Sequence, residues 1–449
     1  MLTGSPIKTI VFFSLPIMLS SLLQYNYSLV DNIIVGRYVS TDALAAVGNV
    51  GPIGSFLIGA AFGLTSGFTI PVAHAFGAGD KRKLSHYAGN SITISAIVGV
   101  AIIIVAHILT RPLLKAIGTP SEIIDLSAAY MNILYFGVPF QMLSNNFTAI
   151  SRAVGESKKP LYFFIVSVIV NFVLDLLFVK NFKWGVEGAA WATLIANAVA
   201  ALLTGIYVIK YNKDVEIKKS DLKPNMATAW EQIKLGIPVS LQFTITSIGS
   251  MCLQSAVNSF GANVIAGFTA AGRVENLTNI PMSGLGVATQ TFVGQNYGAR
   301  NYERITKSVK KIFIADIVVS VIMSLTLYLI GLPTVSLFMT EPNAAIMAAA
   351  KQYIIATAEC YSLVAILFVL RNTLQGLGFT YSNMIAGAGE FFGRLAVAFI
   401  FTKIIGFNAV CYAAPAAWLL ADIPLAIIYL SKHKKFKALA AEQKAKNNI

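Results

Sequence analysis

Six carboxylic acids lie inside long apolar stretches of this 449-residue sequence, where an ionisable side chain needs a physical reason. Placing such a group at the centre of a membrane-spanning helix costs about 2.5–3.5 kcal/mol. The acids are therefore the first candidates for binding protons or cations. They are Asp31, Asp175, Glu275, Glu359, Glu390 and Asp422, and Arg273 and Arg394 are the basic side chains in the same stretches.

Asp31 and Asp175 have no cationic side chain in their own apolar segments. Asp31 has polar neighbours, including the secondary candidates Gln24 and Tyr27, so water or a partner can reach it. Asn171 lies one helical turn before Asp175, on the same helix face. Surroundings of low dielectric constant favour the protonated form of a lone carboxylic acid, which is what a proton carrier needs. We predict ion coupling by Asp31 and Asp175; the alternative is that these acids stay protonated and only join helices through hydrogen bonds.

The other intramembrane charges come in two groups. Glu390 and Arg394 are four residues apart on one helix face, which predicts an internal ion pair with a structural role. Arg273 and Glu275 are two residues apart and point to different faces, so either would pair across helices, for example Arg273 with Glu359. Glu275 and Glu359 are secondary candidates for ion coupling in the second half of the chain. Glu390 and Arg394 are also secondary candidates for the functional site.

Asp422 and a further acid, Asp316, are expected to have no role in ion coupling. Asp422 precedes Pro424 by two residues and is interpreted as a local cap or as the partner of a helix break. Asp316 lies near the start of an apolar segment, and we expect its side chain to extend toward the interface.

Helices that cross a membrane must position these residues. The chain is 56% hydrophobic and 12% charged, roughly half the charged fraction of a soluble protein. Lipid requires the backbone to hydrogen-bond internally, and the alternating ten-residue segments of a membrane barrel are absent. The sequence predicts an all-α integral membrane protein with twelve transmembrane helices at about 10–36, 44–72, 88–110, 126–150, 161–180, 188–209, 230–258, 264–293, 311–332, 349–372, 383–404 and 409–431.

The two halves of the chain resemble each other. The segment 74–80, His-Ala-Phe-Gly-Ala-Gly-Asp, matches the segment 295–301, Gln-Asn-Tyr-Gly-Ala-Arg-Asn, in the second half. Prolines 16 and 238 lie at equivalent positions of the first and seventh segments. An even number of spans gives both halves the same orientation, so we predict two six-helix lobes with pseudo-two-fold symmetry, as some transporters have. A channel built from repeats is the alternative. The expected domains are an N-lobe (1–209), a cytoplasmic linker (210–228), a C-lobe (229–431) and a basic cytoplasmic tail (432–449).

Basic residues gather in alternate loops, which by the positive-inside rule predicts that both termini are cytoplasmic. This distribution explains the net charge of +14 without a nucleic-acid partner. The basic side carries the clusters 81–83, 152–159, 210–223, 300–311 and 432–446 with Lys8 and Arg371, and the opposite side carries Arg37, Arg111, Lys115, Lys180, Lys183, Lys351 and Lys403.

Enzyme chemistry finds little support. The three cysteines, Cys252, Cys360 and Cys411, are unpaired in spacing, which argues against a disulfide framework or a cysteine zinc site. No phosphate-binding loop, HExxH or Gly-x-Ser-x-Gly motif is present. We therefore expect no catalytic residues, no metal site and no cofactor apart from a coupling ion, H⁺ or Na⁺. A membrane-embedded enzyme is the least favoured hypothesis.

Several short motifs together resemble the multidrug and toxic compound extrusion (MATE) family, bacterial branch, over residues 6–431. The motifs, in chain order, are 30–36 (Val-Asp-Asn-Ile-Ile-Val-Gly), 43–48 (Ala-Leu-Ala-Ala-Val-Gly), 76–79 and its repeat 297–299, 152–156 (Arg-Ala-Val-Gly-Glu), and Asn171 with Asp175.

The resemblance implies two six-helix lobes around a central cleft, and export of amphipathic, often cationic, organic compounds or drugs in exchange for H⁺ or Na⁺. In the family, the residues matching Asp31, Asn171 and Asp175 form an ion-responsive cluster, and the proline matching Pro16 is associated with bending of the first helix. The second-lobe aspartate of the sodium-coupled branch falls near Val364, where this chain has no acid, which favours protons.

The expected setting is the cytoplasmic membrane, with a multi-pass monomer in contact with lipid. The alternative function is a flippase for lipid-linked saccharides, which would line its cleft with several basic residues for phosphate. The sequence places only Arg273 and Arg394 inside the membrane, and both have acids nearby.

Overall fold

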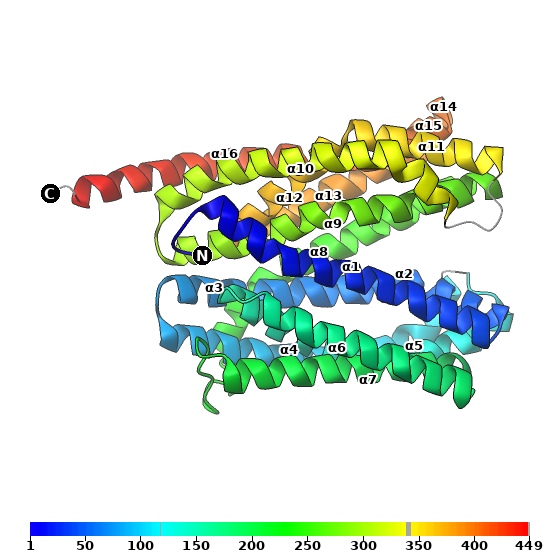
Figure 1. The fold of residues 1–449 in the computed structure, drawn as a ribbon, viewed down its shortest axis with the longest axis horizontal. Helices are drawn as coiled ribbons and strands as arrows, with labels where there is room; N and C mark the ends of the chain where they lie inside the picture. Colours follow the sequence, from blue (N-terminus) through cyan, green and yellow to red (C-terminus); the bar gives the residue numbers. More distant parts are fainter. Residues whose placement is uncertain (117, 338–342, 448–449) are drawn as a thin grey trace. The chain divides into compact units, whose positions relative to one another are not determined.

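The computed structural model describes residues 1–116, 118–337 and 343–447, and its regular elements in these ranges are all helices. The all-α membrane fold predicted from the sequence is confirmed. The first half contains α1 (Pro6–Tyr38), α2 (Thr41–Phe68), α3 (Ile70–Gly77), α4 (Lys81–Ala116), α5 (Ser121–Ala153), α6 (Lys158–Asp175), the π-helix η1 (Leu176–Asn181), α7 (Gly185–Ile206) and the π-helix η2 (Tyr207–Tyr211) (Figure 1).

The described helices of the second half begin at Met226. This half contains α8 (Met226–Asn258), α9 (Ala262–Gly298), α10 (Tyr302–Ser336), α11 (Ala344–Glu359), α12 (Tyr361–Gly376), α13 (Tyr381–Ala396), the π-helix η3 (Val397–Phe401), α14 (Thr402–Ile405), α15 (Phe407–Cys411) and α16 (Ala413–Asn447).

Ten of the described helices are long and apolar enough to cross a membrane, and the pair α11 and α12, bent by 53° at Cys360, makes an eleventh span. The twelfth long helix is α9, with 37 residues, whose charged, Thr, Asn and Gln side chains lower its hydropathy. Some predicted spans are not single straight helices. The span predicted at 44–72 is divided at Thr69 into α2 and α3, and the one predicted at 349–372 contains the bend at Cys360.

The internal repeat extends to backbone geometry. Gly79 and Arg300, at equivalent positions of the two repeats, both adopt a left-handed conformation, with φ of 70° and 55°. Next in sequence, the side chains of Asp80 and Asn301 each accept the backbone amide three residues further on, at 3.0 and 3.3 Å. Both halves thus end a helix and cap the next one in the same way. The conformation costs little at a glycine but is uncommon for arginine, so geometry is retained where the residue type has changed.

The chain forms two compact units, whose boundaries differ from those of the halves expected from sequence. The start of α1 belongs to the same unit as most of the second half, and the start of α8 belongs to the same unit as most of the first half. We call Leu19–Ser240 the N unit, and Met1–Met18 with Leu241–Ile449 the C unit. The boundaries fall inside α1 and α8 rather than in the 210–228 linker. That linker belongs to the N unit, where Val215 is buried and the Leu222 carbonyl accepts from Thr93 Oγ1 at 2.7 Å. The last two residues of the predicted tail lie outside the described residues.

Close helix contact through glycine joins α2 and the start of α8 in the N unit. A Cβ atom built on Gly67 would lie 2.3 Å from Gly236 Cα, and one on Gly63 would lie 2.6 Å from Ser240 Cα. Only backbone faces backbone there, so the helices approach as closely as small residues allow. Beside this contact, the fully buried Gln232 donates to the Phe68 carbonyl at 2.9 Å, where α2 ends.

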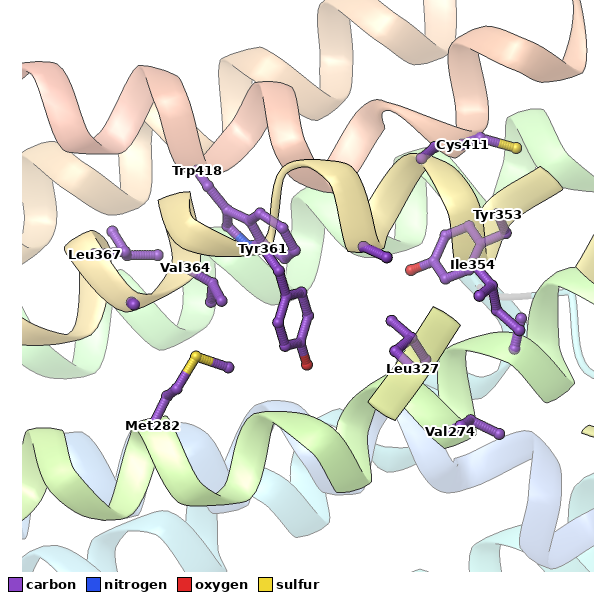
Figure 2. Packing of buried hydrophobic residues seen from close by; sticks show 14 of the residues in the cluster. Val274, Met282, Leu327, Tyr353, Ile354, Tyr361, Val364, Leu367, Cys411 and Trp418 are labelled. Atoms are coloured by element: carbon purple, nitrogen blue, oxygen red, sulfur yellow. The ribbon is translucent and has the colours of Figure 1, made fainter. Parts of the chain in front are cut away.

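The largest hydrophobic cluster of the C unit lies among α9, α12 and α16. Figure 2 shows Tyr361 extending from α12 toward α9, with Trp418 of α16 packed beside it. The two rings meet edge to face at 6.2 Å between centroids. Met282 of α9 is fully buried in the same cluster. This core fixes α12 and α16, which carry charged residues described below.

Candidate functional site

An acidic cluster forms in the N unit where α1 meets α6. With its amide oriented to satisfy its neighbours, Asn171 donates to Asp31 Oδ1 at 3.0 Å and to Asp175 Oδ2 at 3.1 Å. Its oxygen accepts from the Tyr27 hydroxyl at 3.2 Å, and this hydroxyl also lies 3.2 Å from Thr193 Oγ1 of α7. The structure therefore brings Asp31 of α1 to Asn171 and Asp175 of α6, a meeting that the sequence could not show because the two helices are far apart in the chain.

The cluster is buried and acidic. Asp175 is fully buried, Asn171 is 1% exposed, and Asp175 Oδ1 has no hydrogen-bond partner among the described residues. No Lys or Arg forms an ion pair with Asp31 or Asp175 among the described ion pairs. Two carboxylates this close in a medium of low dielectric constant cannot both stay charged, so the pair is suited to hold one proton.

A change in helix type positions Asp175. The α-helical geometry of α6 ends at this residue, and the π-helix η1 follows directly. Single π-turns inside helices occur frequently at functional sites. The C unit has the equivalent change at η3, after Ala396. Ala396 occupies the position of the second repeat that corresponds to Asp175, so the helix geometry is repeated but the acid is not.

Two predicted residues lie on α1 outside this cluster. Gln24 is exposed. Pro16 lies inside the helix, two residues before the boundary of the C unit at Met18. Pro16 therefore belongs to the region where α1 passes from one unit to the other, and not to the acidic cluster.

Glu275 is the centre of a second polar cluster, in the C unit. It is 9% exposed, its Oε2 accepts from the Tyr353 hydroxyl, and its Oε1 accepts from Asn279 at 3.2 Å. Thr278 Oγ1 lies 2.5 Å from the Tyr361 hydroxyl. Figure 2 shows Tyr353 extending from α11 and Tyr361 from α12. The neutral partners of Glu275 were not predicted, because Tyr353 is distant in sequence and neither partner carries a charge.

The suggested pairing of Arg273 with Glu359 is not found among the described ion pairs. Glu359 is exposed, lies at the bend between α11 and α12, and accepts from the Tyr412 hydroxyl at 3.0 Å. The sequence missed this bend because an apolar run does not show where a helix breaks.

The ion pair predicted between Glu390 and Arg394 is present, with 3.3 Å between Oε2 and Nη1. It is not neutral overall, because Arg371 of α12 binds the other oxygen of Glu390. The side chains of Arg371, Glu390 and Arg394 are only 12%, 4% and 11% exposed. Placing Arg371 with the loop charges was therefore wrong: it lies within α12 and points into the C unit.

Replacing Glu390 by Met should lower the free energy of unfolding by about 3–5 kcal/mol, because two buried guanidinium groups would lose their carboxylate. Arg371→Met should cost less, since it leaves the neutral pair of Glu390 and Arg394. Thermal unfolding of purified protein in lipid nanodiscs measures both. Equal effects of the two variants would contradict the arrangement described here.

Two acids expected to be incidental are buried instead. Asp316 is fully buried, so its side chain does not extend to the interface. Asp422 is 6% exposed and lies within the continuous helix α16, so it caps no helix end and Pro424 causes no break. Neither carboxyl group has a hydrogen-bond partner among the described residues. Burial without a hydrogen-bond partner is costly for a charged carboxylate.

The helical repeat and the buried ionisable clusters define a multi-pass membrane transporter. The sequence model of the MatE family matches residues 16–177 and 238–400, more than half of the chain. The chain belongs to this family, whose members are transporters rather than enzymes. Its two matched segments correspond to the two repeats.

Similar proteins cover most of the chain. The "Probable multidrug resistance protein YoeA" of Bacillus subtilis is 28% identical over 378 residues, covering 83% of this chain and 81% of the relative. The "Multidrug export protein MepA" of Staphylococcus aureus is 25% identical over 436 residues, covering 96% and 95%. A solved structure described as the outward-facing conformation of a multidrug resistance MATE family transporter is 26% identical and has a TM-score of 0.89, covering 97% of each chain.

Proposed function

We propose that this protein exports amphipathic, often cationic, organic compounds, including drugs, in exchange for protons. The cluster of Asp31, Asn171 and Asp175 carries the proposal, because it is a buried site suited to one exchangeable proton. The relatives named for multidrug resistance and multidrug export support the substrate class. Na⁺ is the alternative coupling ion, since carboxylate, amide and hydroxyl oxygens also suit a hard cation.

The cluster couples the ion to the helices because its residues come from different elements. When one proton is bound, Asp31 and Asp175 carry a single negative charge, and Asn171 donates to both. When the proton leaves, two carboxylates repel each other across α1 and α6. Protonation therefore favours close approach of the two helices, and loss of the proton favours separation. A change of this kind at the Asp31 end of α1 is the conformational step that we assign to coupling.

We place the protein in the cytoplasmic membrane with both termini in the cytoplasm, on the basis of its loop charges. In this orientation the linker 210–228 and the tail are cytoplasmic. We also propose that it acts as a monomer surrounded by lipid, without a cofactor other than the coupling ion and without nucleic acid.

A flippase for lipid-linked saccharides is the second candidate. One observation favours it: Arg371 adds a further buried basic residue to those found from sequence, so Glu390 shares two guanidinium groups. Guanidinium groups are well suited to phosphate. The pairing with Glu390 leaves one net positive charge rather than the several that a pyrophosphate would require.

Transport by the reconstituted protein distinguishes proton coupling, sodium coupling and the flippase. Vesicles loaded with ethidium receive an imposed H⁺ gradient or an imposed Na⁺ gradient, and ethidium movement is followed by fluorescence. We expect transport that follows the H⁺ gradient. Transport under the Na⁺ gradient alone would replace the proton by sodium, and no transport under either gradient would favour the flippase.

A further inference from the structure

We propose that the C unit binds the phosphate group of an anionic membrane lipid in an open pocket at the start of α10. The pocket has a volume of about 360 Å³. Basic and hydroxyl side chains from the first three turns of α10 dominate its wall. The residues that carry the argument are Asn301, Glu303, Arg304, Lys307, Ser308 and Lys311.

Among the described residues, the hydrogen bonds and the ring contact that hold Arg304 come from neutral groups. Its Nη2 donates to the carbonyl groups of Met1, Thr3 and Gly4 at 3.3, 3.0 and 2.9 Å. Its guanidinium carbon lies 5.4 Å from the centroid of the Phe292 ring. Its Nε is buried and has no hydrogen-bond partner among the described residues. A fixed guanidinium group without a carboxylate among the described ion pairs is a suitable partner for phosphate.

The acid in the pocket is already neutralised. Glu303 Oε1 lies 2.6 Å from Lys307 Nζ and 2.8 Å from Lys444 Nζ. Arg304 and Lys311 also line the pocket, so four basic side chains lie in or beside a pocket that contains one carboxylate. The pocket has an excess of positive charge that an anion would balance, and the N-terminal end of the 35-residue helix α10 adds to it.

The tail of α16 supplies Lys444 because aromatic packing fixes its path. Phe436 is 6% exposed and stacks on Tyr302 with 5.6 Å between centroids. It also meets Tyr297 edge to face at 6.0 Å. The tail helix continues past the beginning of α10 (Figure 1), so a basic side chain of the tail reaches Glu303.

The next turn of α10 indicates a lipid rather than a soluble phosphate. Ile314, Val318 and Val321 are 57%, 53% and 47% exposed on this apolar span. Ile314 follows Lys311 by three residues, a rise of roughly 4.5 Å along the helix. The basic pocket thus lies where an apolar, lipid-facing surface begins, at the level of headgroups. A lipid held there by its phosphate would place its acyl chains along these side chains. Basic pockets on the cytoplasmic side of membrane proteins bind anionic headgroups.

Binding of dioleoyl phosphatidylglycerol to the full-length protein tests this site, measured by native mass spectrometry and by thermal stabilisation, with dioleoyl phosphatidylcholine as the neutral comparison. Lys311→Gln should weaken binding of the anionic lipid about fivefold, the effect of one basic residue near a membrane surface. This change removes no described hydrogen bond, so the protein should fold. Arg304→Gln should weaken binding more.

Lys310→Gln is the matched control, because Lys310 is the exposed neighbour of Lys311 on α10 and does not line the pocket. It should bind phosphatidylglycerol like the wild type. An equal loss for Lys310→Gln and Lys311→Gln would show only diffuse attraction and overturn the site. Stabilisation by inorganic phosphate equal to that by the lipid would overturn the lipid assignment in favour of a soluble ligand. Because these measurements need neither drug nor ion gradient, they are independent of the proposed transport activity.

Discussion

Proton-driven efflux of ethidium should fall to the level of protein-free vesicles when Asp175 is replaced by Asn. The new amide cannot lose a proton, and it cannot form the charge that repels Asp31 in the deprotonated cluster. The hydrogen bond to Asn171 can be kept because the remaining oxygen still accepts. The substitution therefore removes the exchangeable proton while preserving size, and Asp31→Asn should act in the same way.

Asp125→Asn provides the matched control. Asp125 lies on α5, its side chain is 77% exposed, and it pairs with Arg111 at 2.7 Å. Losing an exposed ion pair costs at most about 1 kcal/mol, so transport should remain near the wild-type rate. Ethidium binding by purified Asp175→Asn, measured by fluorescence polarisation, separates lost coupling from lost folding. Normal efflux by both Asp175→Asn and Asp31→Asn at every pH would rule out coupling through this cluster.

A large loss of stability should come from Gly67→Ala. The added methyl group would lie 2.3 Å from Gly236 Cα, against backbone that cannot move aside without shifting α2 or α8. Overpacking costs about 1–3 kcal/mol and occasionally more, and we expect the upper end of that range here. Thermal unfolding of the purified variant in nanodiscs should show a lower midpoint, and the yield of folded protein should fall.

Gly54→Ala is the comparison, because Gly54 lies on the same helix and a Cβ there meets nothing within 4 Å. It should leave the unfolding midpoint unchanged or raise it slightly, since alanine favours helix more than glycine does. If Gly54→Ala and Gly67→Ala lowered the midpoint equally, the close contact of α2 with α8 would not limit stability.

The sequence predicted the helical membrane fold and its repeat because both depend on composition and periodicity, which are local properties. It also paired Glu390 with Arg394, since residues four apart share a helix face. Asp31 and Asp175 could be singled out because charge is rare in apolar helices. Their meeting through Asn171 depends on helix packing, which the residues alone do not specify; the resemblance to a family suggested it.

Other features could not be predicted because they arise from contacts distant in sequence. Arg371 lies near the end of its predicted span and was therefore interpreted as a loop charge. In the structure it pairs with Glu390 of α13, a contact that the sequence does not show. Tyr353 became a partner of Glu275 through the packing of α11 against α9. Asp316 and Asp422 looked incidental because their positions in sequence do not report burial. The exchange of segments between the units was hidden because hydropathy marks where a span begins, not which helices it contacts.

The exchanged segments have a consequence for how the protein is made. The chain is synthesised from its N-terminal to its C-terminal end. The surface of α2 at Gly63 and Gly67 contacts residues of α8, which are synthesised only after α3 to α7. Ile10 and Phe13 of α1 pack with Phe292 and Ile305, which are synthesised later still. Although α1 precedes α9 and α10 in the chain, it therefore gains these neighbours only after they are made. The contacts of α2 with α8, and of the start of α1 with α9 and α10, can therefore form only after the second half of the chain has been synthesised.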